Sequence, residues 1–252
     1  MDARRAGVVV YELTSVIKQN RDYLSEIDGA TGDGDHGVNM NKGFNMCREQ
    51  LEGKADTIGF AGALDTLGNI LLSEIGGSMG PLYGSFFMEM AESIQGKDSI
   101  GANDYLAMLD AGLSGIMSIV STQLGDKTLL DALVPAIGAF RAALLVDGST
   151  DGADNTGGAG GVDNIGVVGS TDGADDAGGV GGTDGAGDVF GQALAAHKAA
   201  AQAGREATKD MAAKVGRASR MGERSRGFYD AGATSCALIL ASMADSVTAL
   251  LE

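Results

Sequence analysis

The chain has 252 residues, of which 44% are hydrophobic, and a formal net charge of −16. This acidic balance argues against a nucleic-acid partner, because phosphate backbones are bound by basic patches. We identify no N-terminal targeting pattern and no apolar run near the ~18 residues of a membrane span, so we expect a cytoplasmic protein without a membrane partner.

Apolar residues recur at helical spacing along most of the chain, and no alternating run predicts a strand. The predicted helices span about residues 4–26, 38–52, 60–71, 86–94, 106–120, 130–144, 189–214 and 232–251. Asp126 or Thr128 is expected to cap the helix that begins at 130. Cys47 and Cys236 lie singly in apolar helical patterns and are expected to be buried free thiols. The prediction is an all-α fold of eight helices.

Residues 147–188 break this helical pattern. They include 15 glycines and nine aspartates but no lysine or arginine, and GSTDGAD at 148–154 returns at 169–175. A segment with so little apolar surface is expected to be a solvated low-complexity insertion between the sixth and seventh helices. A calcium-binding repeat is the weaker interpretation, because GGAGGVDN misses that motif's register by one residue. The chain, 1–252, is therefore expected to be one domain interrupted at 147–188.

The stretch DGATGDGDHGVNMNKGF at 28–44 holds three aspartates at spacing D-x4-D-x-D, in an expected loop between the first two helices. Neighbouring carboxylates repel one another unless a cation neutralises them, and all-oxygen ligands favour magnesium or calcium. The helix that begins at Gly37, Val38 and Asn39 offers free N–H groups to an anion. The stretch thus predicts a magnesium site beside a phosphorylated ligand.

Three other readings of this stretch are weaker. An EF-hand loop is excluded, because Phe44 stands where its glutamate is required. An aspartyl-phosphate nucleophile would need a hydrophobic strand ahead of Asp33, and YLSEIDGATG precedes it. A helix-capping turn accounts for one aspartate but not for three.

Two further loops carry candidate ligand-binding residues. GGSMGPLYG at 76–84 links two helices and is glycine-rich, but it lacks the lysine of a Walker loop. GRASRMGERSRGFYDAGATS at 216–235 is the most basic stretch and ends at the last helix. Its arginines suit a phosphate ligand, although Arg220 and Arg226 are expected to be solvated.

Four segments together, GDGDHGVNMNKGF, GGSMGPLYGSFF, GDKTLLDALVPA and GRASRMGERSRGFYDAGATS, closely resemble the nucleotide-binding subunit of dihydroxyacetone kinases, the DhaL family. The resemblance covers about residues 10–146 and 189–251. It implies an antiparallel eight-helix barrel with the nucleotide site at one end. It also implies ADP or ATP as the cofactor, with two Mg²⁺ ions held by Asp28, Asp33 and Asp35.

The resemblance assigns the nucleotide contacts as well. They are His36, Gly37, Val38, Asn39, Ser78, Met79, Leu129, Arg217, Asp230, Ala231 and Gly232. Proton transfer by His36 is disfavoured, because phosphoryl transfer depends mostly on positioning and charge neutralisation. His197 is expected to lie on the surface. Met79, Val120 and Ala231 depart from the usual family residues.

These features favour the ADP-binding subunit of a multi-subunit dihydroxyacetone kinase. In that system a partner subunit binds dihydroxyacetone, and a phosphohistidine carrier subunit of the phosphotransferase system rephosphorylates the retained ADP. One alternative is an ATP-exchanging kinase subunit that acts on another ketose, such as erythrulose, or with a fatty-acid-binding partner. Another is a non-catalytic, nucleotide-dependent regulator. A homodimer is a further candidate assembly.

Overall fold

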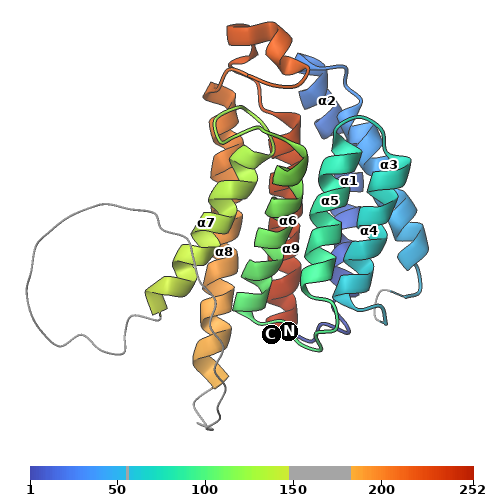
Figure 1. The fold of residues 1–252 in the computed structure, drawn as a ribbon, viewed down its shortest axis with the longest axis vertical. Helices are drawn as coiled ribbons and strands as arrows, with labels where there is room; N and C mark the ends of the chain where they lie inside the picture. Colours follow the sequence, from blue (N-terminus) through green and yellow to red (C-terminus); the bar gives the residue numbers. More distant parts are fainter. Residues whose placement is uncertain (55–56, 148–182) are drawn as a thin grey trace, which may run out of the picture.

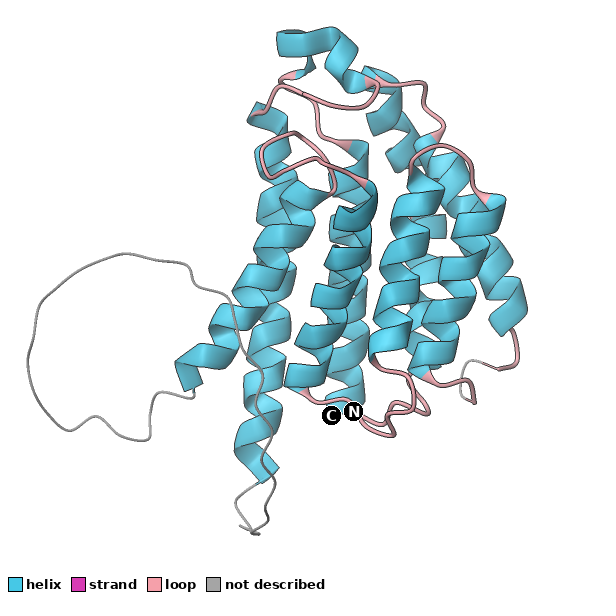
Figure 2. Ribbon diagram, in the orientation of Figure 1, coloured by secondary structure: helices cyan, strands magenta, loops and turns pink. Residues whose placement is uncertain are grey.

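The computed structural model describes residues 1–54, 57–147 and 183–252, and regular structure in these ranges is helical apart from one isolated bridge between Asp2 and Ser99 (Figure 2). The α-helices are α1 (Gly7–Gln19), α2 (Arg21–Thr31), α3 (His36–Leu51), α4 (Phe60–Glu74), α5 (Met79–Ser93), α6 (Ala102–Ile119), α7 (Leu130–Asp147), α8 (Thr183–Ala207) and α9 (Ala231–Leu251). Two 3₁₀ helices, η1 (Thr208–Asp210) and η2 (Ala218–Ser225), lie between α8 and α9. Residues 148–182 of the predicted insertion lie outside the described residues.

Eight of these helices form a closed ring. Contacts join α1 to α3 and then each helix to its successor, and α9 returns to α1. Neighbouring helices of the ring run antiparallel, so α3, α5, α7 and α9 all begin at the end opposite the two termini (Figure 1). The short α2 lies between α1 and α3 at that end. The predicted all-α fold is confirmed.

The interior of the ring is filled by aliphatic and aromatic side chains. On one side Phe87 contacts Phe44, Phe86 and Tyr83, with ring centroids 5.2–6.3 Å apart. Burying a side chain of this size contributes roughly 1.5–3 kcal/mol. Both cysteines are buried and free, as predicted, and burial raises the pKa of Cys47 to about 12.

The first predicted helix, 4–26, is in fact two helices that meet at Asn20. The backbone N–H and the side-chain amide of Asn20 both donate to the carbonyl oxygen of Val16, at 3.1 and 2.9 Å. Asparagine competes in this way with continued helix hydrogen bonding. Asp28 therefore lies inside α2, so its expected position in a loop was wrong.

Two other boundaries differ from the prediction. α8 begins at Thr183, inside the expected insertion, and ends at Ala207, where the 3₁₀ turn η1 begins.

Of the two predicted caps of α7, Thr128 is confirmed, because its hydroxyl accepts a hydrogen bond from the backbone N–H of Leu130 at 3.2 Å. The Asp126 carboxylate instead pairs with Lys214 at 3.1 Å.

His197 on α8 is fully buried, so its expected surface position was wrong. Its ring lies edge-on to Tyr105 and Phe140, with centroids 6.5 and 6.0 Å away. Burial lowers the pKa of His197 to about 4, against the smaller opposing effect of the Ala136 backbone carbonyl. The alanine-rich sequence around it gives little hydrophobic contrast, so the pattern did not distinguish the buried face of α8.

By length and composition, α9 could cross a membrane: it has 21 residues and a mean hydropathy of 1.6. The expectation that no apolar run approaches a membrane span was therefore wrong. Half of the stretch is buried inside the protein, and α9 contacts α1, α7 and α8. A helix that packs against several neighbours is apolar around much of its surface, which explains this composition.

Candidate functional site

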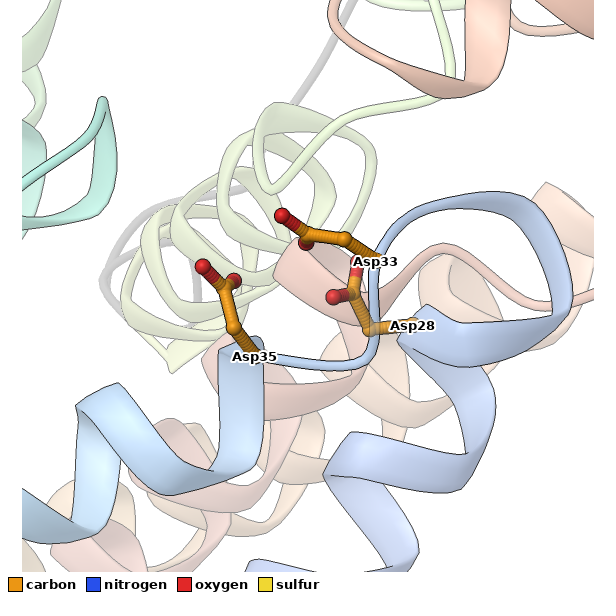
Figure 3. Close-up of side chains that lie close together, drawn as sticks. All are labelled: Asp28, Asp33 and Asp35. Carbon is orange, nitrogen blue, oxygen red and sulfur yellow. The ribbon is translucent and has the colours of Figure 1, made fainter.

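Three carboxylates gather where α2 connects to α3. Asp28 lies in the last turn of α2, Asp33 in the connecting turn, and Asp35 at the N-cap position of α3. Figure 3 shows their side chains directed toward one shared space, and one oxygen from each lies within 4.8 Å of the others. The structure therefore brings together the three residues predicted as metal ligands.

Local backbone geometry holds this turn in place. The N–H of Gly32 donates to the carbonyl oxygen of Asp28 at 2.5 Å and closes α2. Gly34 then adopts φ +76°, a conformation that favours glycine. The backbone N–H of His36 donates to the Asp28 carboxylate at 3.3 Å, so Asp28 also fixes the start of α3.

The electrostatics of the cluster favour a bound cation. Burial and the neighbouring Asp33 carboxylate raise the pKa of Asp35, while Arg217 opposes that shift. The Arg217 guanidinium forms ion pairs with Asp33 and with Asp35, at 3.6 Å for the latter. Three carboxylate ligands without histidine or thiolate suit Mg²⁺ or Ca²⁺ rather than a softer metal. The residues present thus fit a magnesium ion.

The beginnings of α3, α5, α7 and α9 are linked to one another beside this cluster. The Ser235 hydroxyl of α9 lies 2.9 Å from His36 Nε2 of α3 and 2.8 Å from the Tyr83 hydroxyl of α5. Gly232 of α9 approaches Leu129, which immediately precedes α7. Helix N-termini carry partial positive charge and unpaired N–H groups, so this end of the ring attracts an anion.

His36 and Asp230 use their side chains within the protein. Burial lowers the pKa of His36 to about 4, against the opposing effect of Asp28, so its ring is neutral near pH 7. The Asp230 carboxylate accepts a hydrogen bond from the N–H of Ala233 at 2.7 Å and caps α9. Burial raises the pKa of Asp230 to about 6.

The other predicted contacts line the same end of the ring, and the backbone N–H of Asn39 donates to the carbonyl oxygen of Asp35 at 2.9 Å. Gly37, Val38 and Asn39 form the first turn of α3, with Val38 46% exposed. Ser78 is exposed at the N-cap position of α5, and Met79 begins that helix partly buried against the core. No hydrogen bond joins Ser78 or Met79 to the three carboxylates in the described part of the chain.

Two basic residues expected to be solvated differ in their contacts. Arg220 is exposed and lines a cavity of about 440 Å³ together with Arg217, Asp33 and four neighbouring residues. Arg226 is also exposed, but its guanidinium pairs with Glu223 at 2.6 Å. Arg217 is therefore the member of this basic stretch that reaches the carboxylates in the described structure.

Sequence reasoning missed Ser235 and Tyr83, which connect three helices at the site. Tyr83 is buried, and its hydroxyl also donates to the carbonyl oxygen of Gly232 at 3.2 Å. Ser235 is the last residue of the basic stretch 216–235, and Tyr83 belongs to the glycine-rich stretch 76–84. The sequence therefore shows both as polar residues near the start of a helix. Their spatial proximity, across more than 150 residues of sequence, was not visible.

Comparisons with known proteins agree with this architecture. A family model described as the DAK2 domain matches residues 30–156 and 171–245. An ADP-binding subunit DhaL of PEP-dependent dihydroxyacetone kinase from Escherichia coli is 31% identical over 230 residues, covering 91% of this chain and 90% of that subunit. A corresponding Listeria innocua subunit is 30% identical over 242 residues, covering 95% of this chain and 93% of the relative.

A solved structure shares the fold. The dihydroxyacetone kinase from C. freundii, in complex with AMP-PNP and Mg²⁺, matches 96% of this chain with a TM-score of 0.61 and 21% sequence identity. The chain spans only 33% of that solved chain. The similarity therefore concerns one helical part of a longer protein.

Proposed function

The chain belongs to the DAK2 domain family, together with the ADP-binding DhaL subunits of dihydroxyacetone kinases, and from this premise we propose that it binds ADP or ATP with magnesium as a phosphotransferase subunit. The observation that carries the proposal is the carboxylate cluster, whose oxygens lie within 4.8 Å of one another beside the N-terminus of α3. An oxygen-ligand cluster beside a helix N-terminus is suited to a metal-bound phosphate chain.

Each group of residues has a proposed role in holding the nucleotide. Two Mg²⁺ ions would be held by Asp28, Asp33 and Asp35. They would offset the negative charge of the nucleotide phosphates. The N–H groups of the first turns of α3 and α5, at 36–39 and 78–79, bind phosphate oxygens. Leu129 packs against the base.

The remaining predicted residues are proposed to neutralise the phosphate charge and to close over the nucleotide. Arg217 is positioned for the phosphates, because its guanidinium already lies at the carboxylate cluster. Asp230, Ala231 and Gly232 close the site from the start of α9. His36 positions the start of α3 through Ser235 and is not assigned a proton transfer, because its buried ring stays neutral near pH 7.

The second substrate is proposed to arrive on a partner protein. A separate subunit presents dihydroxyacetone, whose hydroxyl oxygen bonds to the γ-phosphorus as the bond to ADP breaks. ADP is the leaving group, and the hydroxyl proton passes to solvent. A phosphohistidine carrier subunit restores the phosphoryl group to ADP retained by this chain, as the PEP-dependent names of the relatives favour. Positioning and charge neutralisation by this chain are the chemistry that phosphoryl transfer requires.

Nucleotide extraction tests this proposal first. The purified protein is washed extensively and denatured, and the released nucleotide is identified by mass and absorbance. Near-stoichiometric ADP supports the carrier-linked kinase, whereas an empty protein that binds ATP reversibly with Mg²⁺ supports an exchanging kinase. Absence of both retained nucleotide and Mg²⁺-dependent binding would overturn the proposal and leave an interaction role.

A matched pair of variants tests the carboxylate cluster. Asp33→Asn removes one ligand charge at nearly constant size and is expected to reduce Mg²⁺-dependent nucleotide affinity by at least tenfold. Asp110→Asn removes the same charge from an exposed ion pair between Asp110 on α6 and Arg141 on α7, and it is expected to leave the affinity unchanged. Equal affinities for the two variants would remove the cluster from the binding mechanism.

A further inference from the structure

Lys127 is a buried lysine in the loop between α6 and α7. Its side chain is 2% exposed, and its ammonium donates to three main-chain carbonyl oxygens, those of Met211, Ser225 and Phe228, at 3.1, 2.5 and 2.8 Å. A buried charge is costly unless it is fully hydrogen-bonded, and here three acceptors satisfy it. Lys127 therefore joins three points of one distant segment, 211–228.

The backbone at Lys127 supports a specific role for this side chain. Its φ is +64°, and it is the only non-glycine residue with positive φ among the described residues. Such a conformation costs energy for a side-chain-bearing residue and persists only where surrounding contacts impose it. The three hydrogen bonds of the ammonium contribute to that constraint, together with the hydrogen bond that the N–H of the next residue, Thr128, donates to the Asp131 carboxylate.

The segment held by Lys127 carries Arg217. It contains the 3₁₀ helix η2, which is interrupted at Gly222 with φ +54° and ψ −129°. Among the hydrogen bonds that support it, the N–H of Ala213 donates to the Ser225 hydroxyl at 2.8 Å within the segment. The N–H of Gly227 donates to the carbonyl oxygen of Lys209, just before the segment, at 2.7 Å. A segment with so few regular hydrogen bonds depends on outside contacts for its position.

The loop that carries Lys127 also contributes to the other side of the site. Leu129, two residues later, approaches Gly232 at the start of α9. The buried Asp131 carboxylate accepts hydrogen bonds from the N–H groups of Gly125 and Thr128, at 2.5 and 2.7 Å, and so fixes this loop onto α7. Lys127 thus connects a rigid loop beside Leu129 to the segment that presents Arg217.

We propose that Lys127 is a positioning residue that fixes segment 211–228 so that Arg217 lies at the carboxylate cluster, and that it thereby sets the affinity for the magnesium nucleotide. The positioning is argued from the contacts of Lys127 and does not depend on the proposed function. Asp126 adds a second link from the same loop, because its main-chain carbonyl oxygen accepts a hydrogen bond from the N–H of Lys214 at 3.2 Å. The effect on affinity rests on the proposed function. Lys127 is not assigned a contact with the nucleotide.

Hydrogen exchange tests the positioning in the full chain without nucleotide. In Lys127→Met, amide exchange at Ala213 and Gly227 is expected to rise at least tenfold, while exchange in the core of α4 and α5 stays unchanged. Lys198→Met is the matched control, because it removes a lysine that pairs with Asp245 between α8 and α9. The control is expected to leave the segment as protected as in the natural chain.

A double-mutant cycle with Arg217 tests the effect on binding. Arg217→Met is expected to weaken ADP–Mg²⁺ binding at least tenfold in the natural chain, but less than threefold in a chain that already carries Lys127→Met. Such non-additivity is expected when one residue acts through the other. A merely structural role for Lys127 would leave the full effect of Arg217→Met in both backgrounds.

The outcomes separate this inference from the proposed function. Unchanged exchange in segment 211–228, a rise that is equal throughout the protein, or additive effects of the two variants would each overturn the role of Lys127. A natural chain that binds no ADP–Mg²⁺ would overturn the proposed function, and the exchange measurement would still decide the positioning. If Lys127→Met does not fold, Lys127→Asn serves instead, because asparagine tolerates positive φ.

Discussion

Replacing Gly37 by alanine should damage the carboxylate site through the packing of α2 on α3. A Cβ at Gly37 would lie 1.9 Å from the carbonyl oxygen of Arg21 and 2.8 Å from the backbone nitrogen of Ser25. Ordinary contacts begin at 3.4 Å, so the two helices would have to separate by roughly 1.5 Å at this point. Both obstructing atoms belong to the backbone and move only with the whole helix.

The expected consequence has two parts. Overpacking typically costs about 1–3 kcal/mol, and a rigid backbone obstacle favours the upper end, so Gly37→Ala should lose about 3 kcal/mol of unfolding free energy. Asp28 moves with α2 while Asp35 moves with α3, so their oxygens would no longer lie within 4.8 Å. Displacements near 1 Å reduce site function by about 100-fold, and we expect a similar loss of Mg²⁺-dependent nucleotide affinity.

Gly29→Ala is the matched control within the same helix pair. A Cβ at Gly29 would approach only the Cα of Gly34, at 3.8 Å, which is an ordinary contact. Alanine is favoured over glycine in a helix by up to about 1 kcal/mol, so this variant should be as stable as the natural chain or more so. Urea denaturation and calorimetric titration with ADP and Mg²⁺ measure both properties. A Gly37→Ala protein that matches Gly29→Ala in stability and affinity would refute the argument.

Three further measurements probe buried polar groups and thiols. Asp131→Ala should lower the unfolding free energy by about 2–3 kcal/mol in urea denaturation, because two N–H groups lose a carboxylate acceptor; an unchanged midpoint would contradict this. His197, with a pKa lowered to about 4 by burial, binds a proton more readily when unfolded, so its contribution to stability is lost as pH falls from about 6.5 toward 4. Between pH 7 and 4.5 the natural chain should therefore lose about 2–3 kcal/mol more unfolding free energy than His197→Phe does. An equal loss in both proteins would argue against a buried neutral imidazole. Cys47 and Cys236, whose thiol pKa values burial raises, should react with a thiol reagent only after denaturation, and rapid reaction in the native state would contradict their burial.

Local patterns determined much of the fold and the proximity of the three carboxylates. Apolar spacing of three and four residues predicts helices because that period places side chains on one face, and the described structure is helical throughout its regular elements. The spacing of Asp28, Asp33 and Asp35 was sufficient to predict that the three carboxylates lie close together, since they fall within eight consecutive residues beside glycines that allow a tight turn. Those inferences depend on interactions between near neighbours, which a sequence records directly.

Only the tertiary structure decided the rest. The break at Asn20 depends on side-chain competition for one carbonyl, and the burial of His197 depends on how α8 meets the rings of Tyr105 and Phe140. The closed antiparallel ring brings the beginnings of α3, α5, α7 and α9 to one end, which places Ser235 against His36 across 199 residues. Lys127 likewise meets its three carbonyls 84–101 residues away. Such contacts follow from the packing of whole helices, and no local period in the sequence encodes them.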